Sequence, residues 1–245
     1  VNLEEYTEEN PYKEFGKNAV YLIDQAWGRE PVDIPTIKKY QPESTSTSSG
    51  QVLTRPYTYD ETRIIIMEMV DKLVLELFEK GLTTDQIVLD VGYDIENLTD
   101  PKRRAEYKGE IVRDRYGREI PKHAGSRISL GKHTSSTKLI TSKTLELFER
   151  IVDKKLLTRR LTITANHLLS VEEAKASEVA EQLTLFDTAE DVAKKEADED
   201  REKRMQRAML DIKTRFGPNA VMKGTSYLDA ATGIERNESI GGHKA

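Results

Sequence analysis

The 245-residue sequence contains no cysteine. Without thiols the chain cannot form a disulfide, a cysteine nucleophile, an iron–sulfur cluster or a cysteine-ligated zinc site, and this composition favours a reducing compartment. Long apolar runs are also lacking, since none approaches the roughly 20 residues that cross a bilayer. The first residues, Val1–Glu5, have neither the basic start nor the apolar stretch of a signal peptide. We therefore expect a cytoplasmic protein with no membrane partner.

Motifs for common catalytic chemistry are scarce. The four histidines never occur at the i, i+4 spacing of a zinc-binding helix, so no metal site is expected. The run Gly131–Thr134 lacks the serine or threonine that must follow the lysine of a phosphate-binding loop. The acidic clusters at 60–61 and 198–200 are typical of a helix cap and a solvated helix, not of two-metal phosphoryl chemistry. From its residues alone, the chain is not predicted to be an enzyme.

Charge is distributed unevenly along the chain. The total is mildly acidic, with 38 basic and 43 acidic residues giving a net charge of −5. Residues 60–98 contain 3 basic and 10 acidic residues, whereas residues 99–160 contain 17 basic and 8 acidic residues, a net charge of +9. A basic block of this kind is expected for a protein with a polyanionic partner, although exposed charges can also be merely solvated.

Hydrophobic periodicity predicts an α+β domain in the middle of the chain. Ile66, Val70, Leu73 and Leu77 recur at helical spacing after the N-cap Asp60. Alternation of apolar and polar residues marks the strands. The predicted elements are strand 44–58, helix 60–81, strand 87–93, strand 127–132, a helix around 145–152 and strand 160–165. This β-α-β-β-α-β order predicts a split, ferredoxin-like arrangement, in which two helices cover one face of an antiparallel sheet and leave the other face open.

The segments around this domain differ from it in composition. Residues 15–27 have helical spacing and end at Gly28, which predicts a short helix that cannot bury its apolar face alone. Three prolines between residues 31 and 42 indicate a linker. Residues 95–126 are basic and interrupted by glycine and proline, so we expect a long connection with a loose hairpin. After Leu169 the chain is rich in Glu, Ala, Lys and Asp, which predicts a largely helical or disordered tail.

Several stretches resemble the C-terminal part of a UmuC-like Y-family (DinB/UmuC) translesion DNA polymerase. The run FGKNAVYLIDQAWG at 15–28 resembles the end of the family's thumb domain. ESTSTSSGQVL at 43–53 resembles the first strand of its little finger, and RRLTITANHL at 159–168 is similar to the last strand. QLTLF at 182–186 resembles a sliding-clamp-binding peptide, and the ending RNESIGGHKA resembles the tail of Gram-positive-type UmuC-like proteins.

This resemblance implies a division of the chain into parts. They are the end of the thumb (1–31), a linker (32–43), a DNA-binding little finger (44–169) and a C-terminal tail with the clamp-binding motif (170–245). The family's palm supplies the carboxylates that bind magnesium, and its fingers contact the incoming nucleotide, but the sequence contains neither region. Because it also starts with valine, we expect a piece of a longer polymerase. This piece should contain no catalytic residue, metal or cofactor and should be inactive alone.

The implied role is damaged-DNA binding in translesion synthesis, DNA repair and SOS mutagenesis. The implied partners are primer–template DNA and the sliding clamp, the β subunit of DNA polymerase III. Small hydroxyl residues let backbone amides approach phosphates closely, and arginines neutralise phosphates without reading sequence. The predicted DNA-binding residues are Ser44, Ser46, Ser48, Ser49, Gly50, Arg55, Arg127, Ser129, Lys132, Thr134, Arg159, Arg160 and Thr162. The predicted clamp-binding residues are Gln182, Leu183, Leu185 and Phe186.

Two alternatives stay open at this point. Leu183, Leu185 and Phe186 lie in a charged segment with no core of their own to join, which favours a partner's pocket, but they could instead pin the tail onto the little finger. The chain could also be a stand-alone adaptor that links the sliding clamp to another repair protein. The thumb-like helix favours the polymerase fragment, because an adaptor has no need of a helix whose apolar face lacks a mate.

Overall fold

The computed structural model describes residues 9–29, 32–39, 45–177, 189–240 and 243–244, and the chain divides into two compact units, Val1–Glu43 and Ser44–Ala245. The first unit contains α1 (Glu9–Phe15), the 3-10 turn η2 (Gly16–Asn18), α2 (Ala19–Ala26) and α3 (Ile34–Lys39). Among its described residues only Ala19 is buried, whereas the Trp27 side chain is 71% exposed. These short helices therefore do not form a core of their own.

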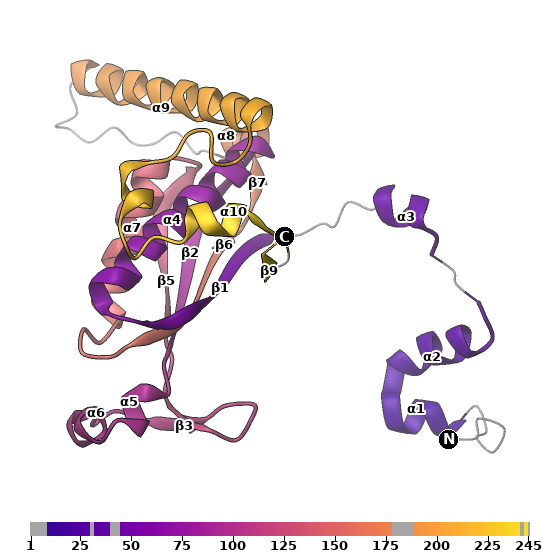
Figure 1. Ribbon diagram of the computed structural model, residues 1–245. Helices are drawn as coiled ribbons and strands as arrows, with labels where there is room; N and C mark the ends of the chain where they lie inside the picture. Colours follow the sequence, from indigo (N-terminus) through magenta and orange to yellow (C-terminus); the bar gives the residue numbers. More distant parts are fainter. Residues whose placement is uncertain (1–8, 30–31, 40–44, 178–188, 241–242, 245) are drawn as a thin grey trace. The chain divides into compact units, whose positions relative to one another are not determined.

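An antiparallel sheet forms the centre of the second unit (Figure 1). Its main strands are β1 (Ser46–Tyr57), β2 (Leu82–Tyr93), β5 (Ala124–Thr134) and β6 (Thr158–Asn166), and the short β7 (Leu169–Ser170) pairs with the start of β2. The strand order is β1-β6-β2-β5, so both β-α-β units are split by a strand inserted between their own two. The predicted α+β class is confirmed.

Two helices, α4 (Tyr59–Glu79) and α7 (Thr137–Ile151), pack on one face of this sheet and against each other. The N-cap of α4 is Thr58 and not the predicted Asp60, which lies inside the first turn. Thr58 and Glu61 form a capping box, in which each side chain accepts the backbone N–H of the other residue. The helix is followed by Gly81 at φ +65°, a left-handed conformation that glycine adopts without steric cost. Local sequence signals thus set both ends of α4.

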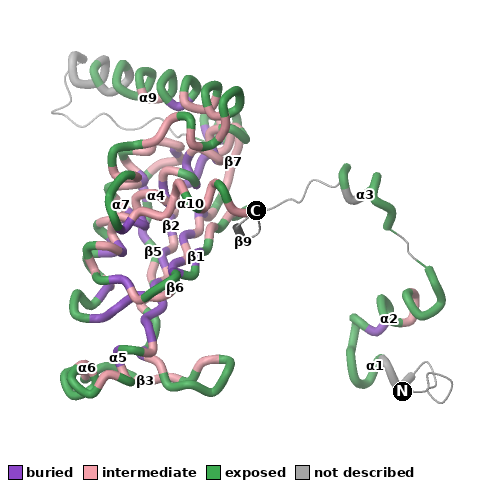
Figure 2. The backbone as a smooth tube through the Cα atoms, viewed as in Figure 1, coloured by how far each residue is buried: buried purple, intermediate pink, exposed green. Residues whose placement is uncertain are grey.

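The hydrophobic core lies between this helical layer and the sheet, as the buried interior of the unit in Figure 2 shows. Alternate residues of the two central strands enter it. They are Ile87, Leu89 and Val91 on β2 and Leu161, Ile163 and Ala165 on β6. Burial of a Leu or Ile side chain contributes about 1.5–3 kcal/mol, so a shift in strand register that exposed these rows would be strongly disfavoured. The intervening residues therefore face away from the helices.

Residues 94–123 form a protrusion between β2 and β5 at one end of the sheet (Figure 1). It contains α5 (Glu96–Thr99), α6 (Pro101–Glu106) and a hairpin of β3 (Ile111–Arg113) and β4 (Glu119–Pro121). The expected hairpin in the basic connection is thus present. Asn97 anchors the protrusion, because its buried side chain donates to the carbonyl of Leu157 (2.8 Å) and accepts from the N–H of the same residue (2.9 Å).

The C-terminal segment adds further helices to the second unit. They are α8 (Val171–Ser177), α9 (Ala189–Phe216), the turn η3 (Gly224–Tyr227) and α10 (Gly233–Asn237), followed by β8 (Ser239–Ile240) and β9 (His243–Lys244). Glu202 of α9 accepts hydrogen bonds from the Ser136 hydroxyl (2.7 Å) and the Lys138 N–H (3.0 Å) at the start of α7. The described part of the tail is therefore largely helical, and α9 contacts the start of α7. The predicted clamp-binding residues 182–186 lie outside the described residues.

Candidate nucleic-acid interface

The face of the sheet opposite α4 and α7, which we call the open face, is lined by rows of mostly small polar residues. Strand register defines these rows, because residues paired across adjacent strands lie side by side. The rows are Ser46, Asn166, Gln86, Ser129; then Ser48, Thr164, Val88, Arg127; then Gly50, Thr162, Asp90, Gly125; and finally Val52, Arg160, Gly92. Residues Ser48, Gly50, Arg127 and Arg160 are exposed, so this face is accessible.

Short side chains give the open face a shallow, hydrogen-bonding surface. Hydroxyl groups of Ser48, Thr162 and Thr164 can each donate to a phosphate oxygen, and their small size lets a ligand approach the strands closely. Gly92 also lacks a side chain on this face, and a Cβ atom there would lie only 3.2 Å from Cβ of Arg160. Glycine at this position therefore leaves room for the Arg160 stem.

Arg127 and Arg160 are the two predicted DNA-binding cations that extend from the open face. Both are exposed, and neither side chain forms an ion pair with another described residue. They lie in different rows, on β5 and β6, with the row containing Asp90 between them. Two exposed guanidinium groups in these rows can neutralise separate phosphates of one nucleic-acid strand or of two.

Arg55 and Lys132 are instead engaged within the molecule. Arg55 lies 2.6 Å from the Glu61 carboxylate and over the ring of Tyr57. The hydrogen bond from Arg55, with further bonds from Thr58, lowers the pKa of Glu61 to about 2. Lys132 pairs with Glu199 of α9 at 2.7 Å. Binding of a phosphate by either cation would compete with an existing carboxylate.

Arg159 and Arg160 are neighbours in sequence but occupy different positions. In the ladder between β2 and β6, Arg160 and Thr158 pair with the consecutive residues Gly92 and Tyr93, so Arg159 is the extra residue of a β-bulge. Its Nε atom lies 3.7 Å from the carboxylate of Asp94, whose side chain is almost buried. The structure therefore places only Arg160 in the rows of the open face.

Only some of the predicted serine, threonine and glycine residues lie on the open face. Ser49 pairs with the core residue Ile163 and lies on the helix-covered side of β1. Thr134 is buried at the end of β5, where its hydroxyl accepts the Ser136 N–H. Ser44 lies outside the described residues. Those on the open face are Ser46, Ser48, Gly50, Ser129 and Thr162.

Several open-face residues were not among those predicted from the sequence. Gln86 and Asn166 hydrogen-bond across the strands, with Nδ2 of Asn166 donating to Oε1 of Gln86 at 3.1 Å. Asp90 occupies the middle of the face, with His123 Nδ1 3.4 Å from its carboxylate. Thr164 lies beside Val88 and Ser48. The period-two alternation along β2 and β6 places these residues on the side of the sheet that faces away from the core.

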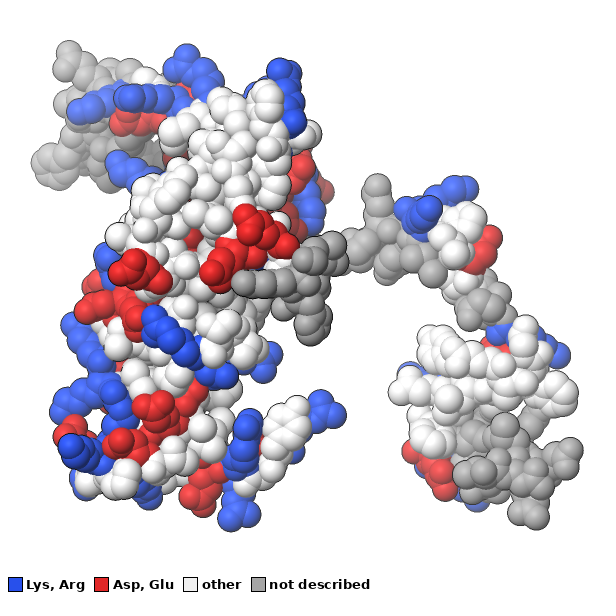
Figure 3. All heavy atoms as spheres, in the orientation of Figure 1, with Lys and Arg blue, Asp and Glu red and all other residues white. Residues whose placement is uncertain are grey.

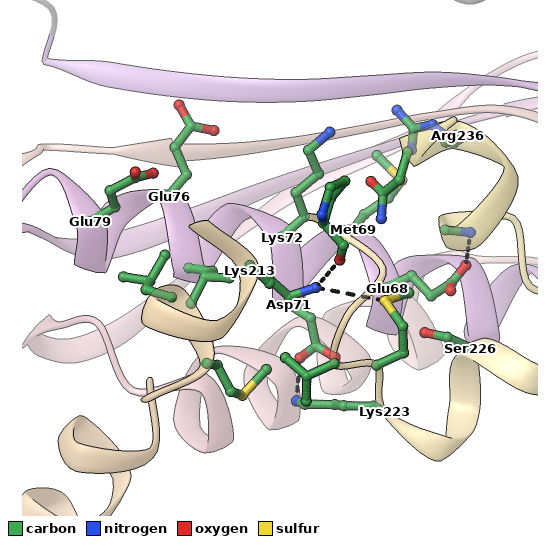
Figure 4. Close-up of a pocket in the computed structure, with 18 of the residues that line it drawn as sticks. Glu68, Met69, Asp71, Lys72, Glu76, Glu79, Lys213, Lys223, Ser226 and Arg236 are labelled. Carbon is green, nitrogen blue, oxygen red and sulfur yellow. Dashed lines mark hydrogen bonds and ion pairs between the residues drawn. The ribbon is translucent and has the colours of Figure 1, made fainter. Parts of the chain in front are cut away.

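A groove lies elsewhere on the unit, between α4 and the C-terminal segment (Figure 4). Its volume is about 410 Å³, and Met69 contributes to its apolar lining. Asp71 forms an ion pair with Lys223 at 2.5 Å, while burial raises the pKa of Asp71 and outweighs the opposing effect of that lysine. Glu68 accepts the N–H groups of Thr232 (2.8 Å) and Gly233 (3.1 Å). These contacts hold the C-terminal segment against α4.

Neither a metal centre nor a membrane span is found in the part of the chain that the structure describes. No three His, Asp or Glu side chains among those residues are grouped so that they could hold a metal ion. None of the helices there is both long and apolar enough to cross a membrane.

A family model for the impB/mucB/samB family C-terminal domain matches residues 44–185. The chain belongs to this family. The resemblance to the C-terminal part of a UmuC-like Y-family polymerase is thereby confirmed. The chain is also 30% identical over 151 residues to a protein of Halalkalibacterium halodurans named DNA polymerase IV 2, an alignment that covers 60% of this chain and 32% of that protein. It thus spans about a third of the length of this curated relative.

The impB/mucB/samB C-terminal domain includes the whole sheet, both covering helices and the protrusion. The open face therefore belongs entirely to the family domain. The match ends at residue 185, so α9 and α10 lie beyond it.

Proposed function

We propose that this chain is the DNA-gripping and sliding-clamp-tethering portion of a Y-family translesion DNA polymerase. In this role it serves damaged-DNA binding, DNA repair and SOS mutagenesis in the cytoplasm. The observation that carries the proposal is the open face of the family domain, where hydroxyl and amide groups accompany two exposed arginines. The name of the Halalkalibacterium halodurans relative, DNA polymerase IV 2, supports the same role.

The open face is suited to holding the DNA backbone without reading its sequence. Arg127 and Arg160 neutralise phosphates, and the hydroxyls of Ser48 and Thr162 donate hydrogen bonds to phosphate oxygens. Such contacts fix the position of the duplex but carry no base information. A polymerase that must accept distorted templates requires this kind of grip.

Catalysis is assigned to other parts of the parent polymerase. Its palm is proposed to supply the carboxylates that bind magnesium, and its fingers to contact the incoming nucleotide. The chain itself contributes binding energy and keeps the parent on DNA.

Tethering to the sliding clamp is assigned to Gln182, Leu183, Leu185 and Phe186. Support comes from the sequence: Leu185 and Phe186 are adjacent apolar residues in a charged segment, and Gln182 can hydrogen-bond at the rim of a pocket. A linked clamp site raises the effective concentration of the polymerase at DNA without new DNA contacts.

The proposal is tested by measuring DNA binding of open-face variants by fluorescence anisotropy across a salt series. Arg127→Ala/Arg160→Ala should weaken duplex binding about equally for all sequences and should reduce the log–log salt slope by about 2, since each lost phosphate contact removes about 0.9. Arg159→Ala should have a smaller effect, because Arg159 already faces Asp94.

A matched control is Arg55→Ala/Lys132→Ala, which removes the same charge from cations engaged elsewhere. If both double variants changed affinity and slope equally, binding would depend on net charge alone. The open face would then lose its assigned role.

A further inference from the structure

The tip of the β3–β4 hairpin is a preorganised turn built around one carboxylate. Asp114 Oδ1 accepts the N–H groups of Tyr116 (2.8 Å) and Arg118 (2.9 Å), and its Oδ2 accepts from Nε of Arg118 (2.8 Å). Gly117 follows at φ +77°, where its N–H donates to the Asp114 carbonyl (2.9 Å). The turn is therefore held by its own side chains, and no partner is needed to shape it.

This turn presents an exposed aromatic ring with two arginines close to it in the chain. The Tyr116 side chain is 80% exposed, and the guanidinium of Arg118 lies 5.2 Å from the centre of its ring. Arg115, which precedes Tyr116 in the chain, is exposed and forms no ion pair with another described residue. An exposed aromatic with neighbouring arginines fits a nucleic acid, which offers bases or sugars for the ring and phosphates for the cations.

The hairpin is rooted where the open face ends. His123, at the junction of the protrusion with β5, approaches the last row, since a Cβ at Gly92 would meet both Arg160 and the His123 ring. In Figure 1 the hairpin extends from this end of the sheet away from the side of α7, and in Figure 3 its basic tip stands apart from the body of the unit. A duplex lying on the open face could therefore continue toward the tip.

We propose that the β3–β4 hairpin is a second nucleic-acid contact, in which Tyr116 packs on a sugar or an unstacked base and Arg115 neutralises a phosphate of the same DNA held by the open face. The proposal rests on the proposed function, because it extends that binding surface beyond the sheet. Asp114 acts as a positioning residue that holds the ring and Arg118 in place.

Stacking by Tyr116 and phosphate binding by Arg115 are measured separately with variants of the hairpin tip. The ligand is a fluorescein-labelled primer–template with a single-stranded overhang. Tyr116→Ala should weaken binding by about 5- to 20-fold with an unchanged salt slope, since stacking does not release counterions. Tyr116→Phe should bind like the parent chain. Arg115→Ala should reduce the slope by about 0.9. The matched controls are Tyr227→Ala, which removes a 71% exposed tyrosine on η3, and Arg204→Ala on α9, and both should leave binding unchanged.

Asp114→Ala tests whether DNA binding by the hairpin depends on the conformation of its turn or only on its net charge. Removing an acidic residue makes the hairpin more basic, so charge alone predicts tighter DNA binding, whereas loss of the turn predicts weaker binding. We expect weaker binding, by several-fold. Glu110→Ala, which removes the exposed partner of Lys122, makes the same charge change without touching the tip and should not weaken binding.

The absence of native cysteine permits a test that does not depend on affinity. An iron–EDTA group tethered at Glu119→Cys, beside the tip, should cleave DNA next to and outside the stretch cleaved from Ser48→Cys on the open face. Cleavage from Ser48→Cys alone, together with unchanged binding of the tip variants, would overturn the hairpin contact and leave the open face intact. Failure of the parent chain and of all variants to bind DNA would instead overturn the proposed function.

Discussion

Glu61 closes the first turn of α4, and its loss should destabilise the folded chain in a pH-dependent way. Its carboxylate accepts a hydrogen bond from Arg55 (2.6 Å) and from the N–H of Thr58 (2.8 Å). These contacts lower its pKa to about 2 in the folded chain, against about 4.3 in the unfolded chain. Because the folded pKa is depressed, the stabilisation is complete above the unfolded pKa and is lost as the pH falls toward 2.

The magnitude follows from this pKa difference. A shift of about 2 pKa units corresponds to about 3 kcal/mol before screening. The Glu61 side chain is 27% exposed and its partner Arg55 49% exposed, so solvent reduces the net value. We therefore expect Glu61→Gln to lower the free energy of unfolding by about 1–2 kcal/mol at pH 7, the range measured for losses at helix N-termini. The difference in free energy of unfolding between parent and variant should be about half as large at pH 3.

Urea denaturation, monitored by circular dichroism at pH 7 and pH 3, measures this difference in free energy of unfolding. Glu76→Gln is the matched control, because it removes an exposed i, i+4 partner of Lys80 on the same helix and should cost at most about 0.5 kcal/mol. The assigned role of the Glu61 carboxylate would be refuted if the loss of free energy of unfolding in Glu61→Gln were the same at both pH values. A loss equal to that of Glu76→Gln would also refute it.

Three further outcomes concern function. Asp90→Asn should tighten duplex binding by several-fold in anisotropy titrations, because it removes a negative charge from the middle of the open face; weaker binding would indicate that the carboxylate itself contacts the ligand. Leu185→Ala/Phe186→Ala should abolish binding of the sliding clamp in titration calorimetry while DNA affinity stays intact, and clamp binding equal to that of the parent chain would remove the tethering hypothesis. The purified chain should not extend a primer at millimolar magnesium, so template-dependent incorporation would contradict its assignment as a non-catalytic portion.

Local sequence alone predicted the four main strands, the two covering helices and the two faces of the sheet. Alternation along 87–93 and 160–165 separated core residues such as Leu89 and Ile163 from outward residues, because successive side chains of a strand point to opposite faces. Helical spacing from Ile66 to Leu77 identified α4, and Gly81 its end. The resemblance of 43–53 and 159–168 to a Y-family little finger also indicates the family from sequence alone.

Only the tertiary structure decided which of the outward residues form one surface. Cross-strand register joins Gln86 to Asn166, although 80 residues separate them in the chain. Lys132 meets Glu199 of α9, and a bulge in β6 turns Arg159 toward Asp94. Strand periodicity is a local property, whereas register, bulges and ion pairs arise from contacts between distant segments, which depend on how the whole core packs.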